Sequence, residues 1–144
     1  MNFDEHTWQE SAWHRIRHTL FCPETGLIYD YVTSRDHSRR FAHLPSPEEI
    51  ALGFPNPCGW STGMEDCALN GGFLLDLLRF CSREDTGFAR LVAEGLIRCA
   101  EVHGTPGFVA RGISPRDRRS CYGNSSRDQF TLATYGMWRF LTGG

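Results

Sequence analysis

Apolar residues along the chain form two helical patterns that alternate. The first pattern has apolar residues on one face only, as in residues 5–20, where they recur at three- and four-residue spacing. The same pattern covers residues 86–103, with Arg90 and Glu94 on the opposite face. We predict two outer helices here, each with one face in water.

The second pattern is apolar on several faces. It covers residues 63–81 beyond the first turn, and again the helix that follows Ser126 and reaches about residue 141. Each stretch begins with a capping-box sequence, Thr62 to Glu65 in the first and Ser126 to Gln129 in the second. A helix that is apolar nearly all round is expected to be buried on most sides, so we predict two inner helices. The Gly71-Gly72 pair within the first predicts a close approach by a neighbouring backbone.

The remaining segments have the composition of loops and short elements. Residues 27–32 alternate after Pro23 and Gly26, which predicts a short strand, as part of a β-hairpin, or an extended loop. The sequence Ser46-Pro47-Glu48-Glu49 combines an N-cap, a proline at N1 and a glutamate at N3, the pattern of a short helix start. Long loops, 53–63 and 104–125, precede the two inner helices.

The order outer, inner, outer, inner is typical of α-hairpins stacked in a ring. We therefore predict a mainly α fold: residues 1–144 as a single domain, forming the N-terminal portion of an (α/α) barrel, or toroid, of helical hairpins with long loops. The sequence ends at Gly144, where the next outer helix is expected. The last inner helix would then expose apolar surface, which predicts a missing C-terminal segment, an oligomer or an obligate partner.

Composition excludes several classes of function. The chain has 144 residues, 40% of them hydrophobic, and a formal net charge of −2, which favours neither nucleic acid nor a membrane as a partner. All 15 basic residues are arginine, so no lysine is present to form a Schiff base. The first residues lack a signal-peptide pattern, and no apolar run is long enough to span a membrane, which predicts a cytoplasmic protein.

Neither a metal nor a cofactor is predicted. The six cysteines are widely spaced and include no CxxC pair, which argues against a zinc ribbon or a thioredoxin-type centre. Cys67, Cys81 and Cys99 lie on apolar helical faces and are interpreted as reduced core residues. His14 and His18 are four residues apart on a helix, but no third ligand is evident beside them.

Candidate chemistry lies in the segments that lead into the inner helices, because helix N-termini gather there and present unpaired N–H groups. Segment 59–73 supplies Trp60, Glu65 and Asp66, and segment 122–129 supplies Tyr122, Asn124, Arg127 and Asp128. Aromatic rings stack on sugars, and acids and amides bind sugar hydroxyls, so this set favours a carbohydrate. Glycoside hydrolysis uses two carboxylates, for which Asp66 and Asp128 are the candidates. The alternative is that these acids only stabilise helix N-termini, and Glu65 at N3 of its capping box fits that role.

Three motifs carry a resemblance to a known group: GWSTGMEDCALNGG at 59–72, GFVARGI at 107–113 and YGNSSRDQFT at 122–131. In these motifs the chain resembles bacterial proteins of the six-hairpin glycosidase superfamily. The resemblance implies an (α/α) barrel that carries hydrolases or lyases acting on polysaccharides. It also implies that Asp66 and Asp128 begin inner helices at the rim of the catalytic cleft, with Arg111, Tyr122 and Arg127 as substrate contacts.

Three functions remain open from the sequence. The first is a glycoside hydrolase acting on an oligo- or polysaccharide, whose isolated 144-residue chain would lack any catalytic group carried by further hairpins. The second is a non-catalytic helical module that binds sugar or another subunit. The third is a polysaccharide lyase, with Tyr122 as the base and Arg127 or Arg111 neutralising a uronate.

Overall fold

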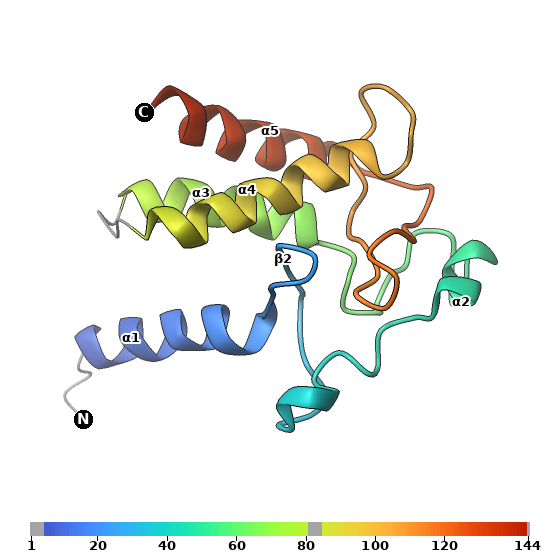
Figure 1. The fold of residues 1–144 in the computed structure, drawn as a ribbon, viewed down its shortest axis with the longest axis horizontal. Coiled ribbons are helices and arrows are strands. Elements are labelled where there is room, and N and C mark those ends of the chain that lie inside the picture. Colours follow the sequence, from blue (N-terminus) through green and yellow to red (C-terminus); the bar gives the residue numbers. More distant parts are fainter. Residues whose placement is uncertain (1–4, 81–84, 144) are drawn as a thin grey trace.

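A computed structural model describes residues 5–80 and 85–143, and in these residues the fold is mainly helical (Figure 1). The elements in chain order are α1 (Glu5–Arg15), a π-helical turn η1 (Ile16–Leu20), β1 (Phe21–Cys22), β2 (Leu27–Ile28), a 3-10 turn η2 (His37–Arg39), α2 (Pro47–Ala51), α3 (Cys67–Phe80), α4 (Thr86–Glu101) and α5 (Arg127–Thr142). The predicted mainly α class is confirmed. Within the described residues, none of the helices is both long enough and apolar enough to cross a membrane.

The centre of the fold is the pair α3 and α5, which lie side by side and run in the same direction (Figure 1). Their backbones meet at two glycines. A Cβ atom on Gly72 would lie 2.1 Å from the carbonyl oxygen of Leu132, and one on Gly136 would lie 2.2 Å from the carbonyl oxygen of Gly72. Only glycine allows so close an approach, so the predicted packing role of the glycine pair is confirmed for Gly72.

Helix α4 runs antiparallel to α3 and covers another of its sides (Figure 1). Its buried face consists of Phe88, Ala89, Val92, Ala93, Gly95, Leu96 and Cys99. On its other face Arg90 Nε lies 3.1 Å from a carboxylate oxygen of Glu94. The prediction of a helix with one buried face and one face in water is therefore confirmed for α4.

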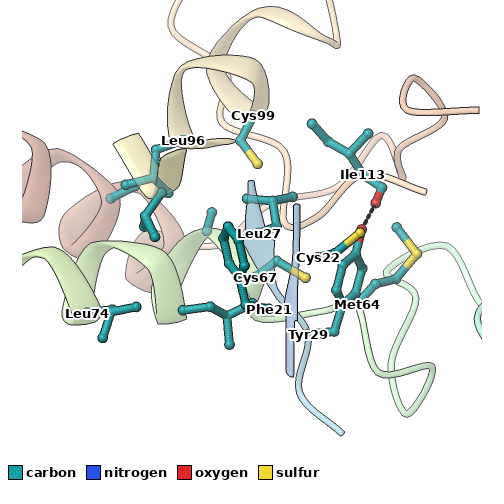
Figure 2. Close-up of a cluster of buried hydrophobic side chains, with 14 of the residues drawn as sticks. Phe21, Cys22, Leu27, Tyr29, Met64, Cys67, Leu74, Leu96, Cys99 and Ile113 are labelled. Atoms are coloured by element: carbon teal, nitrogen blue, oxygen red, sulfur yellow. Dashed lines mark hydrogen bonds between the residues drawn. The ribbon is translucent and has the colours of Figure 1, made fainter. Parts of the chain in front are cut away.

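The two short strands form an antiparallel hairpin in which Phe21 pairs with Ile28 and Cys22 with Leu27. The hairpin enters the centre of the core, where its side chains meet Cys67 of α3, Cys99 of α4 and Ile113 of the 104–125 loop (Figure 2). The hydroxyl of Tyr29, just after β2, donates a hydrogen bond to the Ile113 carbonyl. The hairpin thus joins helices and loop into one core.

One of the three predicted capping boxes is present. In α2, Ser46 Oγ accepts from Glu49 N at 3.2 Å and Glu49 Oε2 accepts from Ser46 N at 2.7 Å. The box from Thr62 to Glu65 is wrong: the Thr62 hydroxyl donates to the Gly59 carbonyl at 2.6 Å, and the Glu65 carboxylate accepts from Ser61 N. Both side chains bond to backbone atoms of the turn before the helix, and α3 begins only at Cys67.

The box from Ser126 to Gln129 is also wrong, although α5 begins where it was expected. Ser126 stands at the N-cap position without a side-chain cap bond, and the side chain of Gln129 reaches α3 instead. Gln129 is fully buried between the two helices, so contacts with α3 replace the local bond to its own helix.

The inner helices are less covered than their composition predicted. Phe73 and Leu77 of α3 and Tyr135, Trp138 and Leu141 of α5 are exposed, with 55% of the Trp138 surface and 62% of the Phe73 surface accessible. These five residues are called the exposed apolar residues below. Cys67 and Cys99 are free and buried as predicted, whereas Cys81 lies outside the described residues.

Candidate functional site

Three carboxylates, those of Asp30, Glu65 and Asp66, gather where the chain enters α3, with one oxygen of each within 4.8 Å of the others. Asp30 follows strand β2 and reaches across to the helix. Its Oδ2 accepts from the backbone N–H of Glu65 at 3.1 Å and of Asp66 at 3.4 Å, and its Oδ1 accepts from Asn70 Nδ2 at 2.9 Å. Asp30 therefore fixes the turn that leads into a helix beginning 37 positions later in the sequence.

The environment of Asp30 favours its protonated form. Partial burial, together with the neighbouring charge of Asp66, raises the pKa of Asp30 from 3.8 to about 6. The hydrogen bonds from the two backbone N–H groups work in the opposite direction and are outweighed. The carboxyl group is consequently half protonated near pH 6.

The Asp66 carboxylate is held from two sides, by an amide donor of α5 and by a nearby guanidinium. Gln129 Nε2 of α5 donates to Asp66 Oδ1 at 2.8 Å, and Arg111 Nη1 lies 3.8 Å from the same oxygen. Gln129 also donates to the Glu65 carbonyl at 3.1 Å and accepts from Leu69 N at 3.0 Å. Through this one side chain, the first turns of α3 and α5 are fixed to each other.

Arg111 connects the carboxylates to the loop that precedes α5. Its side chain is 11% exposed, and besides approaching Asp66 it donates to the Glu65 carbonyl at 3.3 Å and to Asn124 Oδ1 at 3.3 Å. Four residues predicted from the sequence, Glu65, Asp66, Arg111 and Asn124, are thus brought into one connected group.

The other predicted residues lie apart from this group or on the surface. Tyr122 is buried, its hydroxyl donates to the Phe54 carbonyl at 2.5 Å, and burial raises its pKa. Trp60 is 63% exposed on a turn held by Asn56. The Asp128 side chain is 67% exposed and lies 3.8 Å from Arg127, which is itself 92% exposed. Asp128 therefore has freedom to move at the first turn of α5.

Sequence reasoning missed Asp30, Asn70 and the bridging role of Gln129. A signal for Asp30 was available, because a carboxylate within the apolar run 27–32 is expected to be paired if it is buried. Nothing in the sequence pointed to Gln129, which was interpreted as a capping residue of its own helix.

Three clustered carboxylates are the kind of group that can hold a hard cation. Here, however, both Asp30 oxygens accept hydrogen bonds from the protein, and Asp66 Oδ1 accepts from Gln129 beside Arg111. Each of these three oxygens thus already has a donor within the protein. The geometry fits a network that holds the ends of two helices better than it fits a cation site.

No protein family, curated protein or solved structure compared with this chain matches it. The resemblance to six-hairpin glycosidases therefore rests on the three sequence motifs. Fold and site together define a mainly helical protein with a carboxylate network where two parallel helices begin.

Proposed function

We propose that this protein is a carbohydrate-active enzyme of the glycoside hydrolase type, built on an (α/α) barrel of helical hairpins. The observation that carries the proposal is the 2.8 Å bond between Gln129 and Asp66, which joins the two helix ends bearing Asp66 and Asp128. Acid–base hydrolysis of a glycosidic bond needs two carboxylates facing the same substrate. The alternation of α1, α3, α4 and α5 along the chain supports the barrel.

In this proposal Asp66 is the base or nucleophile, because Gln129 and Arg111 hold its carboxylate in a fixed position. Asp128 on the exposed first turn of α5 is the proton donor. The accessible indole of Trp60 offers a stacking surface for a sugar ring. Asp30 acts through the backbone of residues 65 and 66 and is a positioning residue.

A non-catalytic module that binds sugar or another subunit is the second candidate, and the exposed apolar residues support it. On α5, the rings of Tyr135 and Trp138 lie 6.1 Å apart, and exposed aromatic side chains that lie together are typical of interaction surfaces. The lyase alternative has no support from this geometry, because Tyr122 is buried and its hydroxyl already donates to the Phe54 carbonyl. A catalytic base needs access to the proton that it removes.

The test is turnover of a panel of neutral and acidic oligosaccharides by the purified chain, followed by chromatography and mass spectrometry of the products. Asp66→Asn and Asp128→Asn should each lower the rate by about 100-fold or more, because general acid and base groups contribute on that scale. Glu101→Gln, at the exposed end of α4, is the matched control and should leave the rate unchanged.

Thermal melting of each variant separates lost chemistry from lost folding. Sugar binding by the wild type without turnover of any substrate would favour the non-catalytic module. Full activity of both aspartate variants would refute their assigned roles, and an unsaturated product that absorbs ultraviolet light would indicate lyase chemistry instead.

A further inference from the structure

A separate pocket of about 510 Å³ lies between the C-terminal end of α1 with η1 and the segment 32–40. Its lining includes three arginines, Arg15, Arg35 and Arg40, two histidines, His18 and His37, and three hydroxyl side chains. No carboxylate is among the described residues that line it. The pocket therefore has the charge and the donors of an anion site, in a protein whose net charge is −2.

Arg40 is the residue that makes this pocket unusual, because only 8% of its surface is exposed. Its Nη1 donates to the His18 carbonyl at 2.9 Å and lies 3.4 Å from His37 Nδ1, and its guanidinium lies over the Phe41 ring at 4.7 Å. Among the side chains that the structure describes, no carboxylate forms an ion pair with Arg40. Arginine is rarely this buried without a partner of opposite charge.

Glu24, which interacts electrostatically with Arg40, forms its hydrogen bond with another residue. Glu24 lines a neighbouring pocket and accepts a hydrogen bond from the Cys22 thiol at 3.0 Å. That bond is the main cause of the lowered pKa of Glu24, and the charge of Arg40 contributes less. Asp36, in the same segment as the pocket, accepts from the N–H and the hydroxyl of Ser38. Neither carboxylate lines the pocket, and neither forms an ion pair with Arg40.

We propose that this pocket binds an oxyanion, the phosphate or sulfate group of a small ligand. Arg40 uses only Nη1 in its hydrogen bonds within the described residues, so the other edge of its planar guanidinium can bind two oxygens at once. Arg15 and Arg35 supply further positive charge from the two walls, and the hydroxyls of Thr33 and Ser34 supply uncharged donors. The volume leaves room for the organic part of a phosphate or sulfate ester.

This inference does not depend on the hydrolase proposal, because Asp66 and Asp128 do not line the pocket. Its test is isothermal titration calorimetry of the full chain with sodium phosphate and with sodium sulfate, at an ionic strength held constant with sodium chloride. We expect saturable binding at one site, with each anion displacing the other.

Variants separate this site from general attraction to an arginine-rich surface. Arg35→Gln and Arg15→Gln change exposed residues of the lining and should each weaken phosphate binding by roughly tenfold, the scale of one charge-assisted hydrogen bond. Arg39→Gln is the matched control, since Arg39 is exposed in the same segment but does not line the pocket. It should leave the affinity unchanged. Because these residues are exposed, the variants are expected to fold even if a change at buried Arg40 is not tolerated.

A comparison of glucose 6-phosphate with inorganic phosphate identifies the source of the anion. Tighter binding of the sugar phosphate would support the proposal with a phosphorylated ligand, and equal affinities would support it with the free anion. The absence of saturable binding of both phosphate and sulfate would overturn it. An equal loss of affinity in Arg39→Gln and Arg35→Gln would also overturn it, because that result indicates non-specific charge.

Discussion

The protonation state of Asp30 should control how the stability of this fold depends on pH. The pKa of Asp30 is raised from 3.8 to about 6 by partial burial and by the charge of Asp66. Because the pKa of Asp30 is higher in the folded protein than in the unfolded chain, the folded protein binds this proton more tightly. The stabilisation from this group is therefore complete below about pH 4 and is lost as the pH rises through about 6. A shift of about two units corresponds to at most about 3 kcal/mol in the free energy of unfolding.

Asp30→Asn is the perturbation that tests this reasoning. Asparagine has nearly the same shape, stays neutral at every pH, and keeps one oxygen to accept from the N–H groups of Glu65 and Asp66. Near pH 4 the variant should be about as stable as the wild type, whereas at pH 7 it should be more stable by up to about 3 kcal/mol. An amide oxygen accepts these two N–H bonds less strongly than a carboxylate does, which reduces the stability gained at pH 7.

The assay is denaturant unfolding followed by far-ultraviolet circular dichroism between pH 4 and 7.5. The difference between variant and wild type is the useful quantity, because Asp85 and Asp117 have lowered pKa values and contribute a pH dependence of opposite sign to both proteins. Glu101→Gln, exposed at the end of α4, should show no such difference. Parallel stability curves for Asp30→Asn and wild type would show that Asp30 does not titrate in this range and would refute the reasoning.

Three further outcomes follow from the packing. In thermal melts, Gly72→Ala should destabilise the fold by about 3 kcal/mol or more, because its Cβ would lie 2.1 Å from a backbone oxygen of α5. Gly87→Ala is the control: the nearest atom found for its Cβ is 3.7 Å away, so this variant should be neutral or slightly stabilising. Gln129→Leu should cost about 2–4 kcal/mol in denaturant unfolding, since it leaves the buried partners of Gln129 on α3 without their bonds. Cys67 and Cys99 are fully buried, and burial raises the pKa of both thiols, so mass spectrometry should find them unlabelled by a thiol reagent until the chain unfolds. Native labelling of these two at the rate of a free thiol would contradict the packing described.

Much of the candidate site could be predicted because its residues lie in two compact motifs. Glu65 and Asp66 belong to one, and Asn124 belongs to the other. Their grouping around Arg111 depended on the loop from 104 to 125 folding back onto α3, which no pattern in the sequence specifies. Asp30 comes from a third segment, and its place in the network follows from the hairpin packing against the helix.

Local sequence patterns specified the helices and the capping box of α2, whereas the hairpin was only one of two alternatives for residues 27–32 and its first strand, Phe21–Cys22, was not predicted. The helices and the box depend on residues within four or five positions of one another, where periodicity and backbone geometry leave few alternatives. Tertiary packing decided that Asp30 binds the turn before α3, that Gln129 joins α5 to α3, and that Arg40 is buried with no ion pair to a carboxylate among the described side chains. A polar side chain takes the partners that packing brings within reach, and for the first two residues those partners lie on elements far away in the chain.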